Sequence, residues 1–236
     1  MKICSRTTVQ LTVLFLAMSA ASFAADNAYL YVVHGIPGRD VSATLNPGLP
    51  VDVQLNDEIC YVKGLVFGST SGPLTLPVGK VEVKISLANS LMPCSNSPVI
   101  DTTLELSDDK NVSAVAALDG SGAPSLITFV DNLGTVAAGQ GRLVLANAAD
   151  APALQLTLTQ LGITKPITHI FTVSPGKEIT VTVPVGTYSL QAMSGTTAIP
   201  LDNVVAENQS VSLIYVVGSE SNNSVGLVTR VIRDVF

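Results

Sequence analysis

The sequence predicts an all-β protein that consists of two tandem antiparallel β-sandwich domains behind a cleaved signal peptide. Three observations lead to this fold class. Val, Leu, Ile and Ala occur in short runs that Gly, Pro, Asn and Ser interrupt, which is typical of many short β-strands. No segment has the 3.6-residue apolar period of a convincing helix. The same Pro-Val-Gly punctuation also occurs twice, in TLPVGKVEVKI (75–85) and in TVPVGTYSLQA (182–192).

The first 24 residues have the features of a secretory signal peptide. Lys2 and Arg6 form a positively charged start, an apolar run covers 9–21, and Ser22-Phe23-Ala24 supplies small residues, so we expect cleavage after Ala24. The apolar run of about 13 residues is shorter than the roughly 20 that span a bilayer as a helix, which argues against an uncleaved anchor. We therefore expect an exported protein, periplasmic, extracellular or at the cell surface, with no transmembrane segment in the mature chain.

The mature chain is acidic. Removing Lys2 and Arg6 leaves ten basic and 18 acidic side chains, a net charge near −8. Because phosphate groups repel such a chain, nucleic acid and anionic lipid are poor partners. We therefore expect no nucleic acid, and a partner that is a protein or another component of the cell envelope.

The two halves of the mature chain correspond in order. In both Pro-Val-Gly copies a proline ends one strand, where its missing N–H is tolerated, and a glycine precedes the next. Alternating apolar residues then give that next strand one buried face and one solvent-exposed face. The matching strands are expected at 30–34, 51–55, 81–85, 100–106, 111–115 and 126–130 in the first half, and at 143–147, 154–158, 188–192, 199–205, 209–213 and 226–232 in the second.

This repeat predicts two domains. Each half would hold about seven or eight short strands in about 100 residues, a suitable size for one sandwich core. The boundary is expected in 131–141, where small residues and three glycines gather. The predicted division is therefore 1–24 (signal peptide), 25–134 (first sandwich) and 135–236 (second sandwich). A short linker of this kind need not fix the angle between two acidic domains.

Two cysteines remain after the predicted cleavage, Cys60 and Cys94. In an exported chain their natural state is a disulfide, which would close a loop of about 35 residues and contribute roughly 4 kcal/mol at most. The alternative is a pair of reduced, buried thiols. A metal site is less expected, because the two histidines, His34 and His169, do not lie at ligand spacing from the cysteines or from each other.

Several of these segments resemble one bacterial family, known as domain of unknown function 4397 (DUF4397). The resemblance lies in YVVHGIP (31–37), VDV (51–53), GS (68–69) and LPVG (76–79), and in the second half in LANAADAP (145–152) and VPVGTY (183–188). It covers nearly the whole mature chain and rests on strands and turns. The resemblance implies two tandem Ig-like copies of an exported module that has no established activity. It supplies no catalytic or binding residues.

The two histidines are the first candidates for chemistry. His34 ends a predicted strand before a Gly-Pro loop that is a plausible ligand site, but the second half has Asn147 at the matching position. A hydrogen-bonding side chain in both places favours a structural role in holding the following turn. His169 is expected to be an exposed strand residue on the face opposite Ile170.

Other candidate motifs are weak. GSTSG (68–72) has Thr70 where a hydrolase would need its nucleophile, and a strand follows rather than a helix. GQG (139–141) also leads into a strand, so it is not a dinucleotide loop. The carboxylate pairs at 57–58 and 108–109 are expected to be solvated turn residues, with weak Ca²⁺ binding as the alternative. We therefore expect no catalytic site, no cofactor and no metal.

The sequence favours a non-enzymatic Ig-like module that binds or has a structural role at the periplasm or cell surface, through loops or a sheet edge. One alternative is a periplasmic two-domain assembly chaperone, which would need basic groups between its domains, where the sequence offers Arg142. A secreted hydrolase is the other alternative. We also expect the Cys60–Cys94 region to form a distinctive surface and the oxidised first domain to resist proteolysis.

Overall fold

The computed structural model describes residues 26–233, so the predicted signal peptide 1–24 lies outside the described residues. The prediction of an all-β protein is confirmed. These residues form four β-sheets and one short helix, the four-residue α1 (Gly38–Val41), which the sequence analysis did not anticipate. α1 begins after Pro37, which has the extended conformation of an N-cap residue (φ −64°, ψ 135°).

The first half of the chain forms one sandwich of two four-stranded sheets. Its inner sheet has the order β4-β1-β7-β8 and its outer sheet the order β3-β2-β5-β6. β1 and β7 pair in parallel at the centre of the inner sheet, while the other neighbours are antiparallel. The strands are β1 (Asn27–His34), β2 (Val51–Leu55), β3 (Ile59–Leu65), β4 (Thr70–Pro77), β5 (Gly79–Leu87), β6 (Pro98–Leu106), β7 (Asn111–Leu118) and β8 (Pro124–Asp131).

The second half repeats this strand order. Its inner sheet is β12-β9-β16-β17, with β9 and β16 parallel, and its outer sheet is β11-β10-β13-β14, with β15 also paired to β13. The strand expected at 199–205 is interrupted and becomes β14 and β15. The bounds are β9 (Gln140–Asn147), β10 (Leu154–Gln160), β11 (Thr168–Val173), β12 (Glu178–Pro184), β13 (Gly186–Ser194), β14 (Thr197–Pro200), β15 (Val204–Ala206), β16 (Val211–Val217) and β17 (Gly226–Ile232).

The Pro-Val-Gly turns lie where the repeat predicts them. Pro77 ends β4 and Gly79 begins β5 with a φ of 113°, a conformation that favours glycine. Pro184 and Gly186 occupy the same places between β12 and β13. β4 and β12 are edge strands of their sheets, where a residue without an N–H is tolerated.

Each sandwich encloses a core between its inner and outer sheets. The outer sheets contribute every second residue, as the sequence predicts: three alternate residues of β5 are buried in the first core, and three of β13 in the second. These residues are Val81, Val83 and Ile85 in the first half and Tyr188, Leu190 and Ala192 in the second.

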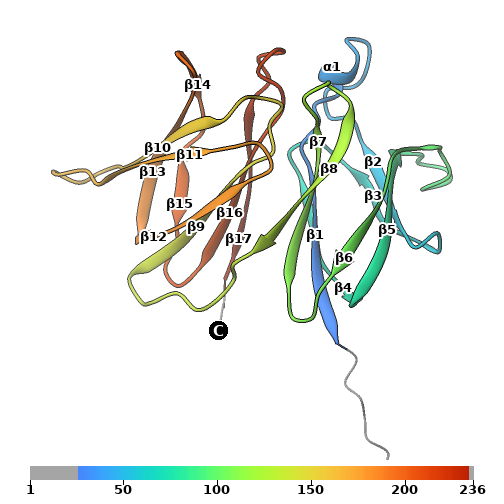
Figure 1. Ribbon diagram of the computed structural model, residues 1–236, viewed down its shortest axis with the longest axis horizontal. Helices are drawn as coiled ribbons and strands as arrows, with labels where there is room; N and C mark the ends of the chain where they lie inside the picture. The colour runs from blue at the N-terminus through green and yellow to red at the C-terminus, as the bar shows by residue number, and fades with distance from the viewer. Residues whose placement is uncertain (1–25, 234–236) are drawn as a thin grey trace, which may run out of the picture.

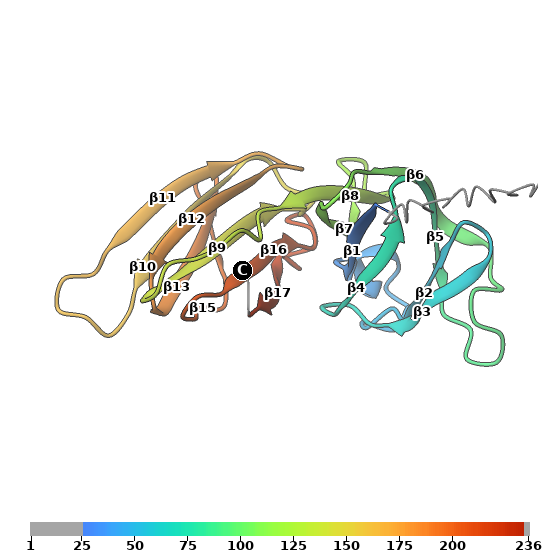
Figure 2. The ribbon, with the colours of Figure 1, turned by 90° about the horizontal axis from the view of Figure 1, so that it is seen from below.

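A third core lies between the two sandwiches. Figures 1 and 2 show the two inner sheets next to each other at the centre of the molecule, with the outer sheets at either end. β7 and β16 are therefore buried on both faces and have nearly unbroken apolar sequences. The relative angle of the domains does not depend on the linker alone, because a packed core also joins them. Its residues include Val33, Val115, Phe129, Val144, Leu213 and Tyr215.

Polar contacts cross this junction as well. Arg230 on β17 donates a hydrogen bond to the carbonyl oxygen of Gly72, and its guanidinium carbon lies 4.6 Å from the centre of the Tyr31 ring. The hydroxyl of Ser224 donates to the carboxylate of Asp40 in α1. The second sandwich is thus bound to the first through hydrogen bonds and a cation–π contact in addition to apolar packing.

Arg142 holds the connection between the sandwiches. Its guanidinium donates to the carbonyl oxygens of Gly134 at 2.6 Å and Thr135 at 3.1 Å, and to the Asn132 side chain at 3.2 Å. These bonds engage both terminal nitrogens of Arg142. The basic group that an assembly chaperone would use to bind its client is therefore already hydrogen-bonded to the linker.

Candidate functional site

His34 and Asn147 have the structural role that the repeat predicts. His34 is 1 % exposed; its Nε2 donates to the carbonyl oxygen of Leu49 at 2.7 Å, and its Nδ1 accepts from the N–H of Ile36 at 3.4 Å. Asn147 likewise accepts from the N–H two residues ahead, that of Ala149, at 3.2 Å. Burial lowers the pKa of His34, so the ring is neutral with its proton on Nε2.

His169 lies on the face opposite Ile170, as predicted, but the expectation that it is exposed is wrong. Phe171 packs against the second core, so His169, two residues earlier on β11, shares its face and is half-buried. The two rings are stacked with their centres 6.0 Å apart. Ile170 is instead 61 % exposed. Alternation along a strand fixes which residues share a face, but only a packed neighbour decides which face is inside.

The other sequence motifs lie in turns and strands. Thr70 of GSTSG is the first residue of β4, and GQG leads into β9. In the turn after β2, the carboxylate of Asp57 accepts from Nζ of Lys84 at 2.6 Å, an exposed ion pair that contributes little to stability. The structure brings none of these residues together with either histidine as a reactive pair.

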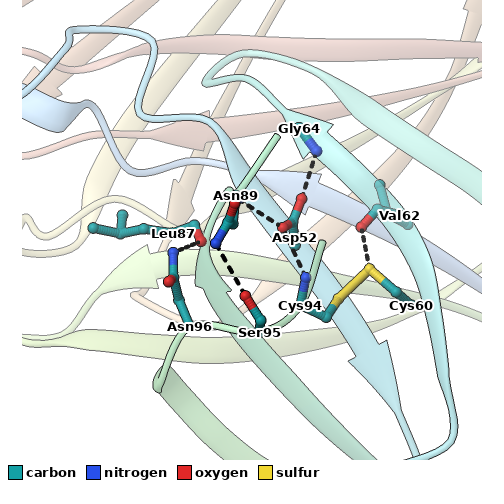
Figure 3. Close-up of a disulfide and its surroundings, with 9 residues drawn as sticks. All are labelled: Asp52, Cys60, Val62, Gly64, Leu87, Asn89, Cys94, Ser95 and Asn96. Carbon is teal, nitrogen blue, oxygen red and sulfur yellow. Dashed lines mark hydrogen bonds between the residues drawn. A yellow bond between two sulfur atoms is a disulfide. The ribbon is translucent and has the colours of Figure 1, made fainter. Parts of the chain in front are cut away.

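The predicted disulfide between Cys60 and Cys94 is confirmed. Cys60 lies on β3 and Cys94 in the 88–97 connection between β5 and β6, with Cα atoms 5.8 Å apart. Figure 3 shows the bond beside the start of β2, where it joins this connection to the edge of the outer sheet. The bridge therefore anchors the middle of this loop covalently to the sandwich.

A buried carboxylate holds the same loop from the other side. Asp52 on β2 is 1 % exposed, and it accepts hydrogen bonds from the backbone N–H groups of Gly64 (2.8 Å), Asn89 (3.0 Å) and Cys94 (2.9 Å). Sequence reasoning missed this role. The only signal was an acidic residue between two valines at the start of an outer-sheet strand.

Asp52 is ionised in the folded protein. Burial raises the pKa of its carboxyl group, but the donors from Cys94, Asn89 and Gly64, with the charge of Lys63, outweigh burial and hold the pKa below its ordinary value. Its oxygens lie near both sulfur atoms, yet the sulfurs are bonded to each other and offer no thiolate to a metal. The arrangement is a structural anchor.

The 88–97 connection, which we call the disulfide loop, presents an apolar tip. The Asn89 side-chain oxygen accepts from the N–H groups of Leu91 and Met92, both at 3.1 Å, and its amide donates to the hydroxyl of Ser95 at 3.0 Å. Leu91 is 90 % exposed and Met92 is 64 % exposed. A loop held by a disulfide, a buried carboxylate and an asparagine thus exposes two large apolar side chains in a defined conformation.

The tip belongs to a wider uncharged surface. Segments 41–51, 65–69 and 86–99 meet at one end of the first sandwich through backbone bonds from Phe67 to Gly48 and from Ala88 to Pro50. None of these three segments, all within the described chain, contains a charged residue. We call this surface the loop face. Its exposed apolar side chains are Val41, Val66, Leu87, Leu91, Met92 and Val99.

An apolar cavity opens on the loop face. It has a volume of about 80 Å³ and lies between the two sheets of the first sandwich. Charged residues that border the three segments include Arg39 and Asp40 in α1, and Asp52 and Lys63, which lie next to segments 41–51 and 65–69 in the chain. The cavity walls include Val41, Leu45, Leu49, Leu87, Val99 and Ile100.

A second buried carboxyl group lies between the sandwiches. The hydroxyl of Ser113 donates its single hydrogen to Asp131 at 2.6 Å. The Tyr215 hydroxyl must therefore be the donor in its own 2.6 Å bond to Ser113. The other oxygen of Asp131 is buried without a hydrogen-bond partner, as is one oxygen of Glu178. Burial raises the pKa of Asp131 to about 7, with a further contribution from Glu178. Sequence reasoning missed this cluster, because its members come from both halves.

The fold and these features define a disulfide-bonded protein of two sandwiches joined through their inner sheets. The family model described as "Domain of unknown function (DUF4397)" matches residues 28–157. The match covers more than half of the chain, which therefore belongs to the DUF4397 family. It extends from β1 into β10 and represents one domain.

Comparison with solved structures finds only distant similarity. The TIE protein of Bacillus anthracis is 13 % identical with a TM-score of 0.26, and covers 80 % of this chain; this chain spans only 33 % of its length. A proposed cell adhesion protein of Bacteroides ovatus is 9 % identical with a TM-score of 0.30 (90 % and 99 % coverage). A proposed adhesin of the same organism is 10 % identical with a TM-score of 0.23 (89 % and 94 %). No curated protein matches the sequence.

Removing the disulfide should expose the first sandwich to proteases. We expect the double variant Cys60→Ser, Cys94→Ser to lose roughly 2–3 kcal/mol of stability and to be cleaved first in the disulfide loop. Limited proteolysis with mass-spectrometric mapping measures this, and the wild-type protein with and without reductant is the matched comparison. Equal cleavage of both halves in both conditions would contradict the anchoring role of the bond.

Proposed function

We propose that this chain is an exported, non-enzymatic module, made of two tandem Ig-like DUF4397 copies (25–134 and 135–236), that binds through its loop face at the periplasm or cell surface. The repeated strand order supports the second copy. The disulfide supports an oxidising compartment. No helix in residues 26–233 has the length and apolarity needed to cross a membrane.

One observation carries the proposal: the loop face exposes large apolar side chains on rigidly held, uncharged loops. Leu91 and Met92 expose large apolar side chains to solvent. Asn89 and the disulfide fix the positions of these two residues. Binding surfaces have few charged residues at their centre. A loop that is already ordered also loses little conformational entropy when it binds. An assembly chaperone is less well supported, because Arg142 and Arg230 are both engaged in contacts with the protein itself.

Retention of the protein on its native host cells tests this function. We expect the wild-type mature chain to stay with the envelope fraction and to bind cells added from outside, and Leu91→Asp to lose most of that binding. Ile170→Asp is the matched control, because it introduces the same charge at an exposed position of the second sandwich. Equal binding by all three proteins, or turnover of ester, peptide or glycoside substrates by the wild type, would overturn the proposal.

A further inference from the structure

The loop face carries both a projecting side chain and a cavity. The projecting group is Leu91, at the tip of the disulfide loop. The cavity mouth is formed in part by Leu87 and Val99, which flank the same loop on β5 and β6. The loop that carries Leu91 therefore begins and ends beside the cavity mouth.

The volume of the cavity indicates which kind of group can occupy it. Pockets that bind small molecules usually have about 300–1,000 Å³, so a cavity of about 80 Å³ is too small for most such ligands. It is large enough for one aliphatic side chain, because a water molecule needs only about 10–15 Å³ on the same measure. Its walls are apolar apart from His34, whose two ring nitrogens are already engaged.

Charge narrows the choice of partner. The mature chain carries a net charge near −8, which disfavours association of two copies over most of the surface. The segments 41–51 and 86–99 carry no charge, so two copies can approach each other here without repulsion between these loops. A bacterial membrane is a poorer partner, because the three segments of the loop face themselves carry no Lys or Arg, the residues that anionic lipids attract.

We propose that the occupant of the loop face is a second copy of this chain, in a two-fold arrangement in which Leu91 of each protomer enters the cavity of the other. A two-fold interface requires a surface that is complementary to itself, and an adjacent side chain and cavity satisfy that requirement. This inference rests on the proposed function, since the same face does the binding, and it names the partner.

Sedimentation velocity of the mature chain over a range of concentrations tests the pairing. We expect a reversible dimer with a dissociation constant of about 10 µM, in the range of a modest interface. Leu91→Asp and Val99→Asp should each raise that constant by about tenfold or more, and Ile170→Asp should leave it unchanged. Circular dichroism and the thermal midpoint verify that each variant is folded.

A photo-crosslinking methionine analogue gives a readout that needs no variant. In the dimer we expect Met92 of one protomer to crosslink to segment 41–49 of the other. A protein that is monomeric at about 100 µM, crosslinks that map elsewhere, or a monomer that binds neutral phosphatidylcholine vesicles would each overturn the inference. If the protein is monomeric but still binds host cells in a Leu91-dependent manner, the inference fails while the proposed function stands.

Discussion

Replacing Asp52 with alanine is expected to destabilise the first sandwich by about 4 kcal/mol. The substitution removes the acceptor for the backbone N–H groups of Gly64, Asn89 and Cys94 at once. It leaves these three partly buried donors without their acceptor beside the disulfide. Urea unfolding followed by circular dichroism measures the loss, and the disulfide loop should become the first site of proteolysis.

Asp101→Ala is the matched control for this prediction. Asp101 lies on β6 in the same outer sheet, but its side chain is half-exposed and its contact with Lys84 is 4.0 Å long. We expect a change of less than about 0.5 kcal/mol there. Similar losses from both variants would mean that Asp52 does not act through its buried hydrogen bonds.

The depressed pKa of Asp52 also gives this anchor a pH dependence. A carboxyl group whose pKa is lower in the folded state contributes stability above its unfolded pKa, near 4, and loses that contribution as the pH falls through the folded pKa. The disulfide loop should therefore loosen only in strong acid.

Asp131→Asn is expected to stabilise the protein at pH 8 and to have little effect at pH 4. Asp131 has a folded pKa of about 7 because it is buried between the sandwiches. The folded state then binds a proton that the unfolded state, with a pKa near 4, releases, so stability falls as the pH rises from about 4 to 7. The full difference is at most about 4 kcal/mol, from 1.36 kcal/mol per pKa unit. Asparagine does not ionise, so the Asp131→Asn variant does not lose this stability as the pH rises.

Thermal midpoints from pH 4 to pH 8 measure this effect. The groups that face Asp131 are Ser113, Tyr215, Glu178 and, through their charge and ring, Arg230 and Tyr31. Asp109→Asn, at an exposed turn, serves as the control and should leave the pH profile unchanged. A profile of Asp131→Asn with the wild-type slope between pH 4 and 7 would show that another group carries the dependence.

Local sequence rules were sufficient for many of the strands and for one covalent bond. Strands 51–55 and 226–232 were predicted with the bounds that the structure has, and the Pro-Val-Gly turns follow from a missing N–H and from the freedom of glycine. The paired roles of His34 and Asn147 could be inferred because each acts on a turn close to it in the chain. The Cys60–Cys94 bond followed from cysteine number.

The tertiary structure decided whatever depends on residues far apart in the chain. The cluster of Asp131, Ser113 and Tyr215 exists because strands from both halves meet, and no spacing within one half encodes that meeting. His169 was expected to be exposed and is half-buried, because alternation does not tell which face is inside until a neighbour such as Phe171 packs. The loop face likewise arises from three uncharged segments that are remote in sequence, and only the closed sandwich places them on one surface.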